Sequence, residues 1–203
     1  MRCGEGRLMS AATMADVVMP MGLPCGRRVP KGNLRWYLLR VPEGCEQSVC
    51  DLLKRIIPGE LLEDAFAPRK ERWAKRGGAW GLETVRMYRG YAFAATRDVS
   101  GLAKALARTT AAAELVGEFG RSWMPLAPEA QGWLEAAMDG EHVIRNSVGV
   151  IQDGVLHVQM GPLVGQEARV SKVDRHKRRC FVRVCDGGAG FAETMPLDVP
   201  SKS

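Results

Sequence analysis

The hydropathy pattern of the chain changes at Gly140, and this change constrains the fold more than any other feature. Before Gly140, apolar residues recur at helical spacing between strand-like segments. After it, short apolar segments follow at roughly ten-residue spacing, separated by turn signals such as Asp153-Gly154, Gly161-Pro162 and Gly187-Gly188. We therefore predict an α+β domain followed by a small all-β barrel.

The part before Gly140 predicts an antiparallel sheet flanked by helices. Residues 34–41 are rich in strand formers, and residues 62–75 and 80–96 are expected to form a long hairpin around Gly77-Gly78. One helix is expected after the first strand. Asp98 is suited to cap a second helix, and Pro128 fits the first position of a third.

These patterns divide the chain into four segments. Residues 1–32 are rich in Gly, Pro and Met and lack a periodic apolar face, so we expect a disordered extension. Residues 33–140 are predicted to form the α+β domain, residues 141–147 a linker, and residues 148–203 the barrel.

Composition excludes several function classes. The chain has 203 residues, of which 46% are hydrophobic and 26% charged, and no apolar run is long enough to span a membrane. The cysteines are scattered without a Cys-x-x-Cys pair, so no structural zinc site is expected. There is no phosphate-binding glycine loop, Gly-x-Ser-x-Gly or His-Glu-x-x-His. We expect a cytoplasmic, non-enzymatic protein without cofactor or metal.

The whole chain carries a formal charge of +6, and many of its basic residues lie in two clusters. The first cluster, which we call the basic run, consists of Arg169, Lys172, Arg175, His176, Lys177, Arg178, Arg179 and Arg183. The second, which we call the hairpin cations, consists of Arg69, Lys70, Arg72, Lys75 and Arg76. Such clusters suit contacts with nucleic-acid phosphates, and the alternative is a solvated surface.

Two motifs resemble the family of NusG-type transcription factors. Trp36-Tyr37 in the first strand, followed by Tyr-Arg-Gly-Tyr-Ala-Phe at residues 88–93, is similar to the amino-terminal domain of that family, with Arg89 where the family has proline. Residues 155–170, which contain Gly-Pro-Leu at 161–163, resemble a KOW motif, and residues 172–179 continue it. The Gly-Pro-Leu turn and the basic run look most like the specialised antiterminators called LoaP.

The resemblance implies partners for both predicted domains. In NusG-type proteins the amino-terminal sheet docks on the clamp helices of RNA polymerase. By this motif the polymerase-binding candidates here are Trp36, Met87, Tyr88, Arg89 and Tyr91. In LoaP-like members the KOW domain is implicated in binding an RNA hairpin, for which the basic run supplies the candidates. The hairpin cations are candidates for upstream or non-template DNA.

Two other functions fit the same motifs. One is a general NusG whose KOW domain binds ribosomal protein S10 or the termination factor Rho. The other is a ribosome-associated KOW protein that binds ribosomal RNA. The resemblance implies a bacterial protein that acts as a monomer.

Overall fold

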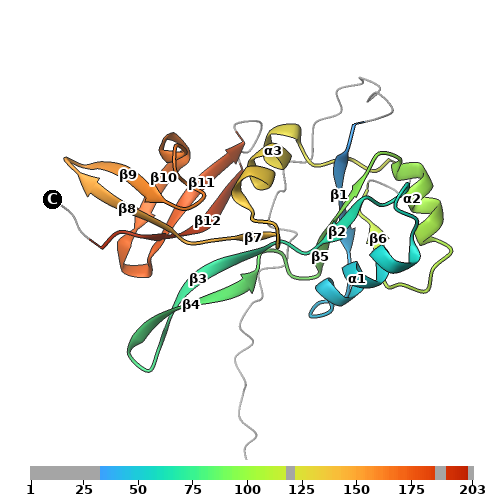
Figure 1. Ribbon diagram of the computed structural model, residues 1–203, viewed down its shortest axis with the longest axis horizontal. Coiled ribbons are helices and arrows are strands. Elements are labelled where there is room, and N and C mark those ends of the chain that lie inside the picture. Colours follow the sequence, from blue (N-terminus) through green and yellow to red (C-terminus); the bar gives the residue numbers. More distant parts are fainter. Residues whose placement is uncertain (1–32, 118–121, 186–190, 201–203) are drawn as a thin grey trace, which may run out of the picture.

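The structure is a computed structural model that describes residues 33–117, 122–185 and 191–200. The extension predicted at residues 1–32 lies outside this range. The predicted α+β region followed by an all-β region is confirmed, and the predicted barrel is a curled five-stranded half-barrel sheet (Figure 1). The half-barrel order is β10-β11-β12-β8-β9, and no pairing between β9 and β10 closes it among the described residues.

The first region contains a four-stranded sheet in the order β2-β5-β1-β6. It is built from β1 (Arg35–Arg40), β2 (Asp64–Phe66), β5 (Tyr91–Thr96) and β6 (Glu114–Leu115). Strand β1 is central and pairs antiparallel with β5 from Arg35–Thr96 to Arg40–Tyr91. Its sequence is almost continuously apolar because both faces of the strand are covered.

Helices cover both faces of this sheet, and alternate side chains of β1 pack against the helices on each face. Helices α1 (Glu46–Ile56) and α2 (Val99–Leu106) share one apolar core with Tyr37 and Leu39. Helix α3 (Pro128–Ala137) lies on the opposite side, in a second core with Trp36 and Leu38 (Figure 1). The alternation follows because successive side chains of a strand point to opposite faces.

The predicted helix starts are also present. The carboxylate of Asp98 accepts a hydrogen bond from the Gly101 amide at 2.9 Å, and Pro128 begins α3.

A long hairpin leaves the sheet and runs beneath the half-barrel (Figure 1). Strand β3 (Arg69–Arg76) pairs along its full length with β4 (Ala79–Arg86). The two-residue turn Gly77-Gly78 has positive φ at both positions, which glycine adopts readily and which suits a tight hairpin. Both predicted hairpin strands were wrong in one respect, because each is interrupted. The segment 62–75 divides into β2 and β3 at Ala67-Pro68, and the segment 80–96 divides into β4 and β5 at residues 87–90.

The second region begins with β7 (Val143–Ile144), which lies inside the predicted linker and pairs parallel with β3. The half-barrel strands are β8 (Ser147–Gln152), β9 (Val155–Met160), β10 (Val170–Asp174), β11 (Arg179–Cys185) and β12 (Phe191–Asp198). Short 3-10 helices η2 (Glu167–Arg169) and η3 (Arg175–Lys177) flank β10.

The two regions share one apolar core. The core that contains Trp36 and Trp133 of the first region continues into Val182, Met195 and Leu197 of the half-barrel. Strand β12 also packs on β3, where Lys70 donates to the Thr194 carbonyl at 2.7 Å. The half-barrel therefore has a defined position against the α+β region.

Candidate nucleic-acid interface

A cleft with a volume of about 1030 Å³ lies between the β3–β4 hairpin, the segment that leads into α1, and strands β11 and β12. Both predicted cation clusters contribute to it, although they are about one hundred residues apart in the sequence. Its cationic side chains are Arg69, Lys70, Arg72, Arg86, Arg89, Lys177, Arg178 and Arg179, against the three carboxylates of Glu43, Glu46 and Glu71. The lining thus carries a formal excess of five positive charges.

The hairpin cations differ in what they contact. Arg72 and Arg76 both pair with the carboxylate of Glu83, and their hydrogen bonds hold the pKa of Glu83 below its usual value. Arg69 donates to the Glu141 carbonyl at 3.0 Å. Lys75 is exposed, and the described contacts include no ion pair for it.

Lys70 is the hairpin cation held most firmly by the half-barrel. Its Nζ lies 3.0 Å from a carboxylate oxygen of Glu193 on β12, and both side chains are largely buried. Lys70 is therefore a structural contact between the two regions as well as part of the cleft wall.

Arg178 joins the basic run to the hairpin. Its guanidinium lies 4.4 Å from the ring centroid of Trp73 and 5.6 Å from that of Trp80, which is cation–π geometry. The backbone of Arg178 is left-handed with φ of 46°, and this conformation follows the tight η3 turn. A hydrogen bond also holds the Trp73 ring, because its Nε1 donates to the Asn146 side-chain oxygen at 3.0 Å.

Two further cations of the basic run also make internal contacts. Arg169 reaches Glu129 of α3 at 3.2 Å and the Val184 carbonyl at 3.1 Å, so it ties the half-barrel to the α+β region. Arg179 pairs with Asp174 at 3.3 Å. Burial alone would raise the pKa of Asp174, but hydrogen bonds from the Lys177 amide and Arg179 hold it below its usual value.

The rest of the basic run faces solvent around η3. Lys172, Arg175, His176 and Lys177 are exposed, and their side chains have no ion pair among the described contacts. Arg183 is exposed on β11 and donates to the Ala168 carbonyl at 3.5 Å. The structure thus separates a group that can meet a ligand from a group that holds the molecule together.

Two of the polymerase-binding candidates, Trp36 and Tyr88, are buried in this conformation. Trp36 is 5% exposed, packs on Phe66 at 4.9 Å between ring centroids, and donates its amide to Gln131 of α3. Tyr88 is also 5% exposed, and its hydroxyl has no hydrogen-bond partner. Burial raises the pKa of Tyr88, and the nearby carboxylate of Glu193 raises it further.

The remaining candidates lie nearer to solvent. Met87 and Tyr91 are half-buried and pack against the same core as Tyr88. Arg89 is 80% exposed, and its nearest acidic partner is Glu43 at 3.5 Å.

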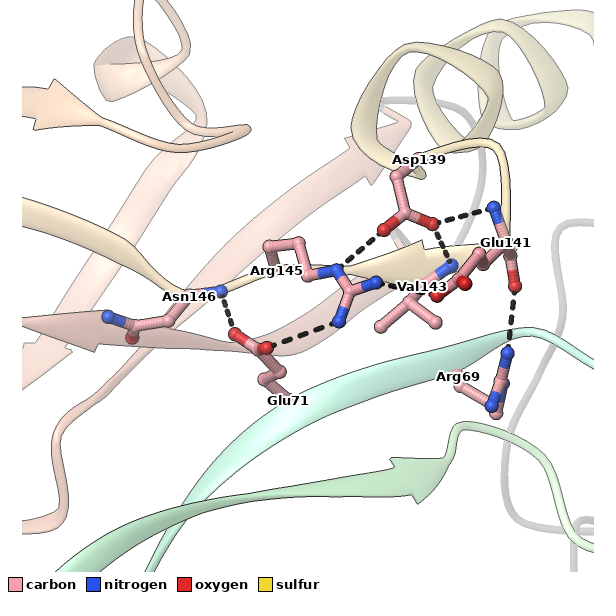
Figure 2. Close-up of polar contacts among 7 residues, drawn as sticks. All are labelled: Arg69, Glu71, Asp139, Glu141, Val143, Arg145 and Asn146. Carbon is pink, nitrogen blue, oxygen red and sulfur yellow. Dashed lines mark hydrogen bonds and ion pairs between the residues drawn. The ribbon is translucent and has the colours of Figure 1, made fainter.

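Sequence reasoning missed a polar network in the predicted linker. Arg145 pairs with Asp139 at 2.5 Å, with Glu141 at 2.8 Å and with Glu71 of β3 at 3.5 Å, and Figure 2 shows how these residues lie around it. Glu71 also accepts from the Asn146 amide at 2.6 Å (Figure 2). Burial alone would raise the pKa of Asp139, but bonds from the Val143 amide, Arg145 and the Glu141 amide hold it below its usual value. This network fastens the predicted linker to the hairpin, and no sequence pattern marked it.

Within the described residues, no group of three or more His, Cys, Asp or Glu side chains could hold a metal ion. No helix of the described part is long and apolar enough to cross a membrane.

Comparisons with known proteins found a similar solved structure but no matching family model. No family model matches the chain, and no curated protein matches it. A solved structure of NusG from Thermotoga maritima, described as showing domain interaction in that protein, is similar with a TM-score of 0.43 and 13% identity. The similarity covers 81% of this chain and 94% of the other. At this level no residue role follows from it.

Proposed function

We propose that this chain is a NusG-like transcription elongation and antitermination factor. Its α+β region would bind the clamp helices of RNA polymerase, and its half-barrel would bind an RNA hairpin. The observation that carries the proposal is the order of the two motifs on this fold. Residues 88–93 lead into central strand β5, and the KOW-like segment lies on the half-barrel that follows.

Because Trp36 and Tyr88 are buried, they can contact the polymerase only after they become exposed. An aromatic anchor contributes to binding only when a partner can reach it. Because Tyr88 shares one apolar core with Met195 of β12, we infer that the half-barrel moves away from β3 before Tyr88 meets the polymerase. Tyr91, Met87 and Arg89 lie at the edge of the cluster and would make the first contact.

The RNA contact is assigned to the solvent-facing side chains around η3, which are Lys172, Arg175, His176 and Lys177. Helical RNA is recognised mainly through its shape, phosphates and 2′-hydroxyls, which an exposed cationic turn can approach. Arg175 is the first candidate for reading a guanine, because its planar fork can also bind phosphate. We further propose a cytoplasmic monomer that uses no cofactor.

The polymerase contact can be tested by co-purification with the intact chain. We expect RNA polymerase to be recovered, and Arg89→Glu with Tyr91→Ala to reduce the recovery. Lys104→Glu, an exposed position on α2, is the matched control and should recover polymerase normally. Recovery of ribosomes without polymerase would refute the proposal and favour the ribosome-associated alternative.

The RNA contact needs a separate test. Sequencing of RNA crosslinked to the protein in its host should recover one or a few leader hairpins. If no RNA is enriched, and the co-purification recovers ribosomal protein S10 or Rho, a general NusG is favoured instead.

A further inference from the structure

We propose that the cleft between the β3–β4 hairpin and the half-barrel binds an unpaired nucleic-acid strand, with cations from both walls on its phosphates and Trp80 stacked on a base. This goes beyond the proposed function, in which the outer rim around η3 meets a folded RNA hairpin. It does not depend on polymerase binding.

The first argument is the sign and placement of charge. The cleft lining carries eight cationic side chains against three carboxylates, and the cations come from both walls. Lys177 stands on the half-barrel side and Arg72 on the hairpin side. A positively charged groove of this kind follows a phosphodiester backbone and draws binding strength from counterion release.

The second argument is that key cations can exchange their present partners. The side chains of Arg72 and Arg89 are 61% and 80% exposed. Arg89 pairs with Glu43, which is 65% exposed, whereas Arg72 pairs with Glu83, which is 22% exposed and also pairs with Arg76. Exposed ion pairs are weak and screened by salt. A phosphate can therefore replace Glu43 at Arg89. It can also replace Glu83 at Arg72, because Arg76 remains paired with Glu83. Lys177 has no ion pair to give up among the described contacts.

The third argument is an aromatic face at the edge of the cleft. Trp80 is 37% exposed, and it is the one aromatic residue among the exposed large hydrophobic side chains of the described part. Arg178 lies nearer to the Trp73 ring, at 4.4 Å, than to the Trp80 ring, at 5.6 Å, and Trp73 is also bound by Asn146. Base stacking on an exposed tryptophan is tolerant of sequence, and it requires a base that is not paired in a helix.

The size of the cleft favours a single strand over a duplex. Its volume of about 1030 Å³ is near the upper end of ordinary ligand pockets, so it holds a few nucleotides of one strand. RNA and DNA share the phosphates and base faces that this site would contact. The test must therefore distinguish the two sources.

The test is fluorescence anisotropy of the intact chain with labelled strands of about 12 nucleotides, within the usual range for such sites. The probes are single-stranded RNA, the same sequence as DNA, and the corresponding duplexes. We expect one strand per chain, tighter binding of single strands than of duplexes, and a steep fall in affinity with salt. The preferred single strand identifies the natural source as RNA or DNA.

Two variants with matched controls locate the site. Trp80→Ala should weaken single-strand binding by roughly five- to 150-fold, whereas Trp80→Phe should retain most of it. Leu82→Ala removes a side chain that is 45% exposed on the same strand but does not line the cleft, so it should have no effect. Lys177→Gln should make the salt dependence shallower by about 0.7 in log–log slope. Lys104→Gln, the same change on α2, should not.

Three results would overturn the inference. Unchanged binding in a folded Trp80→Ala variant, with heparin competing as well as a single strand, would show a general anion surface. Preferential binding of duplexes would exclude an unpaired strand. Two binding events per chain, each lost in only one of the two variants, would show separate sites on the hairpin and the half-barrel.

Discussion

The Nζ atom of Lys70 lies 3.0 Å from a carboxylate oxygen of Glu193, and this ion pair joins two strands that are more than one hundred residues apart in the sequence. Lys70 belongs to the hairpin strand β3 and Glu193 to the half-barrel strand β12. Only 16% and 13% of their side-chain surfaces are exposed. The pair therefore reports whether the two regions remain packed together.

Removing one member of this pair should destabilise the protein. Lys70→Ala leaves Glu193 without its cation in a largely buried position, and we expect a loss of about 2 kcal/mol in the free energy of unfolding. Lys70→Met with Glu193→Leu should recover part of the loss. Denaturant unfolding measures both. Lys75→Ala on the same strand is the control, and an equal loss there would contradict the assignment.

Substitution by alanine should destabilise the protein at Gly161 and stabilise it at Gly132. A Cβ at Gly161 would lie 2.6 Å from the Asn146 carbonyl oxygen, and φ there is 96°, so Gly161→Ala should cost at least about 2 kcal/mol. Gly132 lies within α3 and has open space around it, so Gly132→Ala should stabilise by about 0.5–1 kcal/mol. Thermal unfolding should separate the two variants, and similar melting temperatures would refute the prediction.

Tyr88→Phe should not destabilise the protein despite its core position. The hydroxyl of Tyr88 is buried without a hydrogen-bond partner and lies near the carboxylate of Glu193. Removing an unsatisfied buried hydroxyl is expected to be neutral or to stabilise by about 1 kcal/mol. Half-buried Tyr91, changed to Phe, provides the comparison. Clear destabilisation by Tyr88→Phe in denaturant unfolding would show that the hydroxyl has a partner.

His142 should make stability depend on pH below neutrality. Its ring stacks on Phe66 with centroids 3.9 Å apart, and burial lowers the pKa of His142 although Asp64 acts in the opposite direction. The unfolded chain therefore binds this proton more readily than the folded chain. Stability is full above the usual histidine pKa of about 6.5 and falls as pH drops from there toward the lower folded pKa.

Denaturant unfolding between about pH 7.5 and pH 5 measures this effect. His142→Asn should remove this part of the pH dependence, and asparagine tolerates the positive φ of 57° found at this position. His176→Asn, at an exposed position, should leave the dependence intact. A pH profile unchanged by His142→Asn would contradict the assignment.

The sequence by itself determined the fold class and most of the order of elements. The helix starts at Asp98 and Pro128, the turn Gly77-Gly78 and the strands of the half-barrel all follow from local patterns. These features are local because capping, positive φ and side-chain periodicity depend on residues a few positions apart.

Only the tertiary structure decided which residues face each other. It brought Arg178 onto Trp73 and placed the hairpin cations opposite the basic run across one cleft. It also buried Tyr88, which resembled an exposed docking residue in the sequence, and it used Arg145 to fasten the predicted linker to β3. These relationships depend on how two separately patterned regions pack, and contacts between residues so far apart leave no periodic signal in either segment.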